Sequence, residues 1–592
     1  MDLPPNILEA WEVARKRLRN ANIKPEEKGR FYFLGDLSVV VPADGAGGPI
    51  LPWVPVRIRV STAFPNLIPF ISVEDDRIRG YDHQRLINQT ICSPVESRWD
   101  FSLPPAKAME YFLDEAQALL QSAANGTLVR PGDYYELPDF PLERNTRVVL
   151  HPGTSTDDIE SIDARWGTIQ YGTQGNRVAV FKWNDGQWGE PSGAWLKNHK
   201  ENKLGEWSNV TGGWIYLPFE PVFPPKRPPE TLGDLQKVFQ KAGLNFEEIL
   251  EPLLLPDGKR AWVLCLIGFP IPEKVGGPPD NVHWQALRLP IPPKKVSGFR
   301  PKKKFKGALV RGVLGAPEKL DWMTTYNVDP KQLCTRVPEG ARLHGLRAVV
   351  VGCGALGSVI ALELVKAGVP WIGLVDHDEL EPGNVVRHVL GMDNLGQNKA
   401  NSLGARLYKT NPSVEIKVLD HNALEAILIP DTATIFHEAD LWIDTTGGQG
   451  VARSLGDKAN ELGKPLASIF ITYGARHAAL FLSDPKSGTS LKGVERIFKQ
   501  VGEESTDSPL KAAYNDLWGE PPGEMVRTAP GCYDLTFPAA GYDISFCAAY
   551  LTKALSTALM QGGWHGLILS NPENPWDGGL RVVWNDRGHV PQ

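Results

Sequence analysis

The spacing of hydrophobic residues in the first part of the chain predicts a helix, several strands and a second helix. From Ile7 to Leu18, apolar residues recur every three or four positions, as on the buried face of a helix. Further along, the pattern predicts three strands and a closing helix, at residues 30–42, 55–61, 70–73 and 105–124. This order predicts a small α+β domain over residues 1–140.

The middle of the chain has a different pattern, rich in glycine, proline and tryptophan. Its apolar runs have the length of strands, at Gly167–Tyr171, Arg177–Trp183 and Ala261–Phe269. No group of residues in this part suggests catalysis. Residues 141–325 are therefore predicted to form a β-rich spacer or docking domain.

The last part, residues 326–592, has the pattern of alternating strands and helices. A continuous apolar strand leads into a glycine turn, and a helix follows from Ala355 to about Ala367. A second strand ends at Asp376. This βαβ pattern predicts a parallel, Rossmann-like sheet covered by helices on both faces, so the whole chain is expected to be an α/β multidomain protein.

Composition narrows the possible partners. The chain has 592 residues, 42% of them hydrophobic, and a net charge of −6, which is typical of a multidomain globular protein and argues against nucleic acid as a partner. The most apolar stretch, Ala261–Pro272, is too short to span a bilayer, and no signal peptide opens the sequence. The six cysteines form no CxxC pair. A cytoplasmic, reducing environment with free thiols is expected.

A glycine motif follows the first strand of the Rossmann-like region. Gly352, Gly354 and Gly357 have the spacing G-x-G-x-x-G and open a helix, so backbone N–H groups and the positive end of the helix dipole can face phosphates. Asp376 ends the next strand, where its carboxylate can accept hydrogen bonds from a ribose. On its own, this motif also fits a dinucleotide-binding oxidoreductase.

The residues after the second strand resemble the signature of the ThiF/MoeB and ubiquitin-activating adenylating enzymes. The matching positions are Asp376, Asp378, Asn384, Arg387, Gly396 and Lys399. The resemblance implies ATP as cofactor, with Asp376 on the ribose and with Asn384, Arg387 and Lys399 on the phosphates. The chemistry agrees, because adenylation of a carboxylate builds charge on phosphate oxygens that Arg and Lys can stabilise.

The magnesium ligand departs from the family pattern. Relatives usually carry an Asp in the loop after a later strand, but Gly447 occupies that place here. The nearest carboxylate is Asp444, which is either a ligand or only structural. Mg²⁺ is still expected with ATP, because it offsets phosphate charge.

Two cysteines are candidates for carrying a thioester. Cys532 lies in a G-C-x-x-x-T-F segment that resembles the thioester loop of bacterial ubiquitin-activating-like enzymes fused to a conjugating domain. The helix that starts at Gly541 resembles the last core helix of the adenylating fold, so Cys547 within it is expected to be buried. Cys353, inside the glycine loop, is expected to pack rather than react.

Cys92 belongs to a region, residues 10–125, that resembles the ubiquitin-conjugating fold. The resemblance is carried by a P-x-x-x-P stretch, the cysteine, a tryptophan and a helix that begins at prolines, namely Pro65, Pro69, Cys92, Trp99, Pro104 and Pro105. The family's His-Pro-Asn is absent, and His83, Gln84 or Asn88 is the candidate to stabilise the oxyanion in its place. The alternative is that Cys92 is a buried small hydrophobic residue.

The order of the three regions resembles the fused ubiquitin-activating and ubiquitin-conjugating proteins of bacterial antiphage operons, CBASS operons among them. The resemblance implies adenylation of the C-terminus of a ubiquitin-like protein or a cGAS-like nucleotidyltransferase. A relay from Cys532 to Cys92 and conjugation to an amine of a target protein would follow, in a homodimer. Two alternatives stay open: a ThiF/MoeB-type activator for sulfur transfer, and a non-catalytic scaffold that senses ATP.

Overall fold

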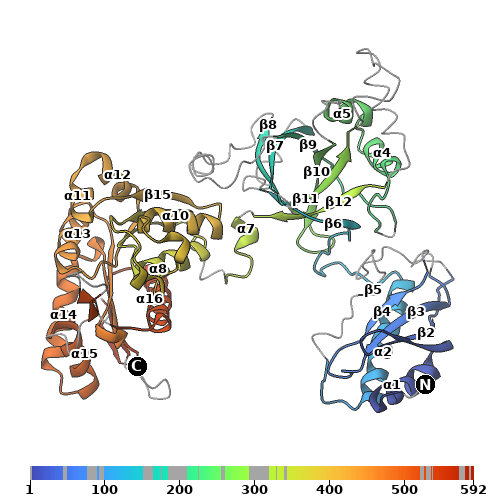
Figure 1. The fold of residues 1–592 in the computed structure, drawn as a ribbon, viewed down its shortest axis with the longest axis horizontal. Coiled ribbons are helices and arrows are strands. Elements are labelled where there is room, and N and C mark those ends of the chain that lie inside the picture. The colour runs from blue at the N-terminus through green and yellow to red at the C-terminus, as the bar shows by residue number, and fades with distance from the viewer. Residues whose placement is uncertain are drawn as a thin grey trace. The chain divides into compact units, whose positions relative to one another are not determined.

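The computed structural model describes most of the chain. The described residues are 3–43, 50–75, 90–91, 99–150, 165–174, 177–184, 210–224, 226–254, 261–291, 319–328, 330–338, 343–519, 526–527, 535–536, 538–571, 581–585 and 588–591. They divide into two compact units, with the change from one to the other between Asn327 and Val328. Figure 1 shows the ribbon of both units.

The first unit begins with an antiparallel sheet in the order β1-β2-β3-β4-β5. The strand bounds are Arg19–Glu26, Arg30–Ser38, Trp53–Ser61, Phe70–Val73 and Thr90–Ile91. Two helices, α1 (Pro5–Arg17) and α2 (Pro105–Ala124), share a hydrophobic core with this sheet. Along β3, buried residues alternate with more exposed ones, so one face of the sheet is buried; the buried residues are Val54, Val56, Ile58 and Val60. The strands and helices predicted for this region lie close to their expected positions.

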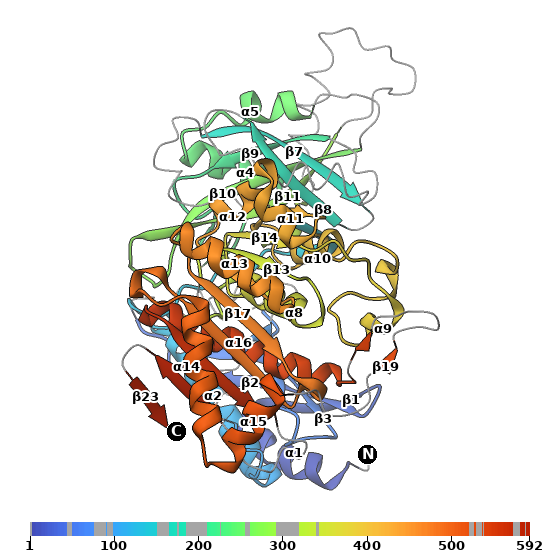
Figure 2. The same cartoon turned by 90° about the vertical axis from the view of Figure 1, so that its left-hand side faces the viewer.

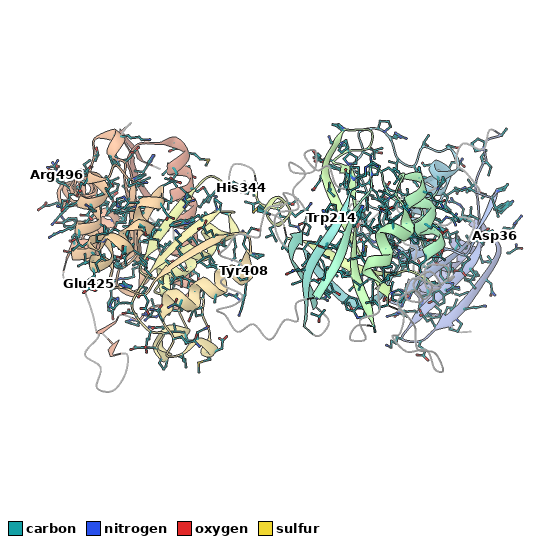
Figure 3. The ribbon with its side chains drawn as sticks, turned by 90° about the horizontal axis from the view of Figure 1, so that it is seen from above. Asp36, Trp214, His344, Tyr408, Glu425 and Arg496 are labelled. Carbon is teal, nitrogen blue, oxygen red and sulfur yellow. The ribbon has the colours of Figure 1, made fainter. Side chains whose placement is uncertain are left out.

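The second part of this unit is a closed barrel in the order β10-β11-β12-β6-β8-β7-β9. The strands, from β6 to β12, span Leu142–Leu150, Trp166–Gln174, Arg177–Asn184, Val210–Tyr216, Trp262–Pro272, Pro279–Pro290 and Asp321–Asn327. Trp214 and Trp284 are buried and meet edge to face with centroids 6.1 Å apart; Trp214 is labelled in Figure 3. The barrel interior is therefore filled by side chains.

Helices α4 (Leu232–Lys241) and α5 (Phe246–Leu253) cover one side of the barrel. Thr231 caps α4 by accepting a hydrogen bond from the backbone of Asp234, and Asn245 caps α5 in the same way. The β-rich character of this region was predicted, but the helices and the closure of the barrel were not. Closure depends on β9 pairing in parallel with β10, a contact between distant segments.

The second unit holds a nine-stranded sheet in the order β15-β14-β13-β16-β17-β18-β21-β22-β23. In chain order from β13 to β18 the strands are Arg347–Val351, Trp371–Val375, Glu415–Leu419, Leu441–Asp444, Leu466–Ile471 and His477–Ser483, and β21 to β23 are His565–Ser570, Arg581–Asn585 and Gly588–Pro591. The first five in spatial order pair in parallel and the rest are antiparallel. The predicted Rossmann-like sheet is present.

Helices cover both faces of this sheet (Figure 2). One face packs against α8 (Ala355–Lys366), α10 (Lys399–Thr410) and α16 (Gly541–Gln561). The other face packs against five helices, α11 to α15, whose bounds are Ala423–Leu428, Pro430–Glu438, Gln449–Glu461, Leu491–Glu504 and Ser508–Trp518. Shorter elements are α7 (Pro330–Leu333), α9 (Pro382–Val385), β19 (Val526–Arg527) and β20 (Leu535–Thr536).

Among the described residues, no helix combines the length and the hydrophobicity that crossing a bilayer requires.

Candidate functional site

The glycine loop joins β13 to α8 at the carboxyl edge of the sheet. Gly352 has a φ of +88°, a left-handed conformation that side chains rarely adopt, and Gly354 caps the helix. A Cβ atom at Gly357 would overlap the carbonyl oxygen of Gly352 and the hydroxyl of Thr445. The first and third glycines are therefore required by backbone conformation and by close packing, and the loop presents the N-terminus of α8 to a ligand.

Asp376 ties this loop to the segment after β14. One carboxylate oxygen accepts a hydrogen bond from the backbone N–H of Cys353 at 2.6 Å, and the other accepts from the N–H of Asp378 at 2.8 Å. Burial raises the pKa of Asp376, while these two backbone hydrogen bonds act in the opposite direction. Asp376 thus holds the glycine loop in place. The sequence pattern predicts a contact between Asp376 and a ribose but not this structural role.

Lys399 is the first residue of α10, and its side chain reaches the segment that follows β14. Its ammonium lies 3.0 Å from the Asp378 carboxylate, and its side chain is 12% exposed. The preceding Asn398 donates from its side-chain amide to the carbonyl of Asp376 at 3.0 Å and to the carboxylate of Asp420 at 2.8 Å. The start of α10 is therefore fixed against the end of β14, which leaves the Lys399 charge with little freedom to move.

Asn384 and Arg387 lie on the short turn around α9. The Asn384 side chain accepts a hydrogen bond from the backbone N–H of Glu381 at 3.1 Å and so closes a capping box. The backbone N–H of Arg387 donates to the carbonyl of Asn384 at 2.9 Å, which ends the turn. The predicted phosphate contacts of both side chains stay predictions.

His388 follows Arg387 and also contacts the glycine loop. Its Nε2 lies 2.6 Å from the Cys353 carbonyl oxygen, and its Nδ1 accepts from the backbone N–H of Leu390 at 3.1 Å. This arrangement requires the neutral ring with its proton on Nε2. Burial lowers the pKa of His388, in agreement with a neutral ring. Nothing in the sequence indicated this contact.

Asp444 ends β16 and is 2% exposed. One of its oxygens accepts from the backbone and the hydroxyl of Thr446, and the other lies 3.3 Å from the Ser468 hydroxyl. Burial raises its pKa. These contacts suit a structural carboxylate, the second of the two roles expected for Asp444. The metal role of Asp444 stays a prediction.

A second group of possible metal donors lies just after β14. Within the described part of the chain, the one group of three acidic or histidine side chains close enough to share an ion is Asp376, His377 and Asp378, with ligand atoms within 4.8 Å of one another. Asp378 is exposed, and a hard carboxylate oxygen is what Mg²⁺ prefers. Gly447, at the place of the usual family aspartate, has a left-handed φ of +68°.

The two candidate thioester cysteines, Cys92 and Cys532, lie outside the described residues, as do His83, Gln84 and Asn88. Cys547 is fully buried in α16, and burial raises the pKa of its thiol to about 12, so the prediction of a core residue is confirmed. Cys353 is also fully buried, as expected, and burial raises its pKa.

Two domain families match the chain. Residues 126–328 match the Cap2 central linker domain, and residues 332–481 match the ThiF family. The first range begins before the boundary predicted for the middle domain and includes the whole barrel.

Individual relatives extend these matches. The ATP-dependent ubiquitin transferase-like protein Cap2 of Enterobacter hormaechei is 27% identical over 470 residues, which are 75% of this chain and 73% of that protein. The probable adenylyltransferase/sulfurtransferase MoeZ of Mycobacterium tuberculosis is 30% identical over 31% of this chain and 40% of its own length. A crystal structure of E. coli MccB with ATP covers 43% of this chain and 66% of that chain, with 18% identity and a TM-score of 0.27.

Proposed function

Because this chain is a Cap2-like protein, with a Cap2 central linker domain ahead of a ThiF-family domain, we propose that it activates a protein's C-terminal carboxylate and passes the acyl group along its own thiols to an amine. It is an ATP-dependent ubiquitin transferase-like enzyme of the ThiF adenylating family. The observation that supports the proposed site most strongly is the network joining the glycine loop, Asp376, Asp378 and Lys399.

The first step is adenylation. A carboxylate oxygen of the substrate attacks the α-phosphorus of ATP, a new P–O bond forms, and the bond to the β-phosphate oxygen breaks to release pyrophosphate. The N–H groups at the start of α8 face the phosphates, and Lys399 and Arg387 supply positive charge as negative charge builds on the phosphate oxygens. Magnesium bound with ATP would offset phosphate charge, and Asp378 is the residue that would hold it.

The second step conserves the activation as a thioester. The Cys532 thiolate attacks the acyl carbon and AMP leaves, and the Cys92 thiolate then takes the acyl group by exchange. An amine on the target finally attacks the acyl carbon, forms an amide and frees Cys92. The four described cysteines support this assignment indirectly, because all are buried: Cys265, Cys334, Cys353 and Cys547.

The conjugating role of the N-terminal region separates this proposal from its alternatives. Trp99 is buried beside Phe64, and its indole N–H donates to the carbonyl of Pro65 at 2.9 Å, so the proline stretch and the tryptophan of the conjugating-fold pattern meet in space. A sulfur-transfer activator has no use for Cys92. A scaffold that only senses ATP catalyses no pyrophosphate exchange.

The partners are part of the same proposal. The activated protein is a ubiquitin-like protein or a cGAS-like nucleotidyltransferase, as in CBASS antiphage operons. The acceptor is an amine of a target protein. The enzyme acts as a homodimer. Similarity to Cap2 over 75% of the chain supports this assignment over the sulfurtransferase one, because the similarity to MoeZ covers only 31%.

The relay is tested by mass spectrometry of reducible adducts, with ATP, magnesium and the C-terminal peptide of a candidate partner. Cys532→Ala is expected to keep pyrophosphate exchange and to lose both thioesters. Cys92→Ala should keep the Cys532 thioester and lose transfer to the amine. Cys334→Ala is the control, because that thiol is buried. Normal loading of Cys92 without Cys532 would show that the adenylate passes straight to the N-terminal domain.

A further inference from the structure

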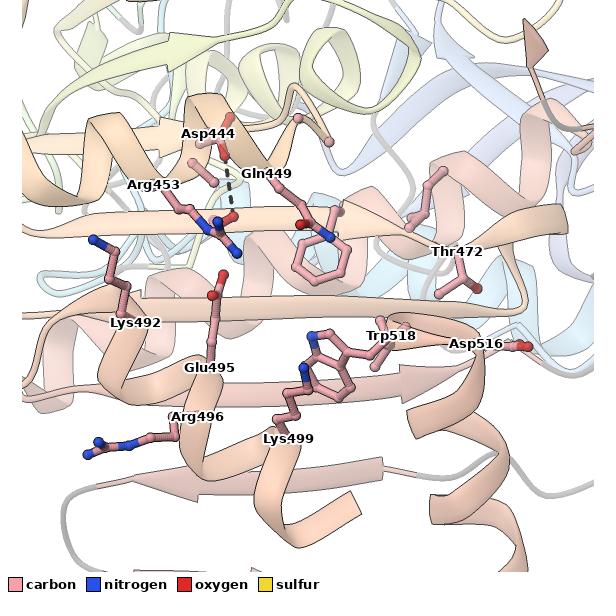
Figure 4. A pocket seen from close by; sticks show the side chains of 17 residues that line it. Asp444, Gln449, Arg453, Thr472, Lys492, Glu495, Arg496, Lys499, Asp516 and Trp518 are labelled. Atoms are coloured by element: carbon pink, nitrogen blue, oxygen red, sulfur yellow. Dashed lines mark hydrogen bonds between the residues drawn. The ribbon is translucent and has the colours of Figure 1, made fainter. Parts of the chain in front are cut away.

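A pocket of about 500 Å³ lies between the sheet and helices α13, α14 and α15 of the second unit (Figure 4). Its lining includes Asp444, the last residue of β16, and Ser468, near the start of β17. Phe470 and Trp518 add aromatic surface. The volume is within the range of ligand pockets, and the position is the edge of an α/β sheet at which ligands bind.

Basic side chains line this pocket from two helices. Helix α14 contributes Lys492, Arg496 and Lys499, which share one helix face because they are spaced by four and three residues. Arg453 comes from α13. Lys492 is paired with Asp457 at 2.7 Å. The side chains of the other three, Arg453, Arg496 and Lys499, are exposed and have no ion pair with any residue that the structure describes.

The carboxylates in the pocket do not balance these charges. Asp516 is already bonded outside the pocket, to Arg476 at 2.9 Å and to His477 at 2.7 Å. Asp444 is buried and hydrogen-bonded, as described above. Glu495 is half-buried; burial raises its pKa, and nearby cations, Arg453 foremost, lower it. Three cations therefore face two carboxylates, so the pocket favours an anionic ligand.

The position of the pocket along the sheet indicates which ligand this is. Neighbouring parallel strands place three features in a row at the carboxyl edge: Asp376 after β14, the glycine loop after β13, and the pocket after β16 and β17. The Thr445 hydroxyl donates to the Gly352 carbonyl at 2.6 Å. Thr445 lies between Asp444 and Gly447, which both line the pocket, so the glycine loop contacts the chain segment that borders the pocket. A nucleotide on the first two features would have its phosphates next to the pocket.

We propose that this pocket receives the C-terminal tail of the activated protein and selects tails with acidic side chains shortly before the terminal carboxylate. Arg453, Arg496 and Lys499 pair with those acidic side chains, while Phe470 and Trp518 contact the apolar part of the tail. This inference rests on the proposed function, because it assumes that the acyl donor approaches the α-phosphate from the side opposite the ribose.

Synthetic peptides test the inference. The hexapeptide Ala-Glu-Ala-Glu-Ala-Gly is compared with its glutamine counterpart Ala-Gln-Ala-Gln-Ala-Gly, both labelled at the amino end, by fluorescence anisotropy with the full chain at low salt. The acidic peptide should bind about 10-fold more tightly. The difference should shrink as salt is added, because exposed charges are screened.

The variant Arg496→Gln/Lys499→Gln should reduce this preference to less than about 2-fold and leave the affinity for the glutamine peptide unchanged. The control Lys409→Gln/Lys553→Gln removes two exposed cations from α10 and α16 of the same unit and should keep the preference. Equal binding of the two peptides by the unaltered chain, or an undiminished preference in the Arg496/Lys499 variant, would overturn the assignment of the pocket.

Peptide-dependent ATP–pyrophosphate exchange separates this inference from the proposed function. A charge preference in binding, without exchange for either peptide, would support the pocket and contradict adenylation. Exchange with the same KM for both peptides would support adenylation and contradict the pocket. The expected result is exchange with both peptides and a KM about 10-fold lower for the acidic one.

Discussion

Two charged regions lie along one edge of the nine-stranded sheet, and they are built in opposite ways. Around the glycine loop, Asp376, Asp378, Lys399 and His388 all have hydrogen-bonding or ionic partners within 3.1 Å. In the pocket beyond β16, cations such as Arg496 are exposed and have no ion pair within the described part of the chain.

The difference matches the ligands proposed for the two regions. A site that performs the same step on the same nucleotide benefits from groups fixed in advance, since no reorganisation is then needed in the transition state. A pocket for a peptide tail benefits from long, mobile cations that can adapt to several sequences. Charges around the glycine loop should therefore contribute both to the stability of the protein and to the rate of adenylation. Charges in the pocket should contribute only to peptide binding.

The largest effect is expected at Lys399 and Arg387, the two cations proposed to contact the phosphates. Lys399→Ala and Arg387→Ala should each lower ATP–pyrophosphate exchange by about 10²–10³-fold, as removal of one transition-state donor does elsewhere. The control is Lys409→Ala, an exposed lysine near the other end of α10, which should exchange at the normal rate. Near-normal exchange in both Lys399→Ala and Arg387→Ala would contradict the assignment of the adenylation site to this edge of the sheet.

A smaller effect is expected for Asp376→Asn. The amide can accept only one of the two backbone hydrogen bonds, so one N–H, of Cys353 or Asp378, loses its partner. Such a loss costs about 1–3 kcal/mol, which should speed hydrogen exchange of residues 351–358 roughly 5- to 150-fold. The KM for ATP should rise as well.

The matched control for this variant is Asp393→Asn, because Asp393 is exposed in the same unit. An unchanged exchange rate at residues 351–358 in Asp376→Asn would mean that Asp376 serves the nucleotide and not the loop. The comparison between the two regions would then lose its main support.

The part of this picture that the sequence predicted is the part encoded locally. The glycine loop, the start of α16 at Gly541 and the end of β14 before Asp376 follow from residues that are close together in the chain. The contact of His388 with Cys353 joins positions 35 residues apart, and nothing in the local pattern specifies it.

The barrel and the pocket show the same limit. Closure of the barrel depends on β9 lying beside β10, and the pocket requires α13 and α14 to face the ends of β16 and β17. From the sequence alone, Arg496 and Lys499 fit an ordinary solvent-exposed helix face. That they form no ion pair with a described residue depends on the positions of the neighbouring helices, which the local sequence does not specify.

A modest pH effect is expected at His388. The folded protein holds this ring neutral, so its pKa is lower than the value of about 6.5 in an unfolded chain. Between these two pKa values the unfolded state binds more protons, and stability therefore falls as the pH drops below about 6.5. Protonation would set an Nδ1–H against the N–H of Leu390.

Hydrogen exchange of residues 351–358, corrected for intrinsic rates, measures this effect. Between pH 7.5 and 5.5 the loop should lose protection in the unaltered chain, whereas His388→Gln should show little change, because glutamine can donate to Cys353 without titrating. His421→Gln, at an exposed histidine of the same unit, should behave like the unaltered chain. An equal loss of protection in His388→Gln would assign the pH effect to another group.

The smallest effect is expected in the pocket, and it is the sharpest test of the comparison. Arg496 and Lys499 are three residues apart on α14, are exposed, and have no ion pair with a described residue. Each has a like charge beside it, and the attraction between Lys499 and Glu495, four residues earlier, acts in the opposite direction. Arg496→Gln/Lys499→Gln should therefore change stability by no more than about 0.5 kcal/mol, and hydrogen exchange over α14 should stay the same or slow slightly. The same variant is expected to lose the preference for acidic peptides. A marked loss of protection over Leu491–Glu504 would show that these cations hold α14 in place, and the pocket would then be a structural feature like the glycine loop.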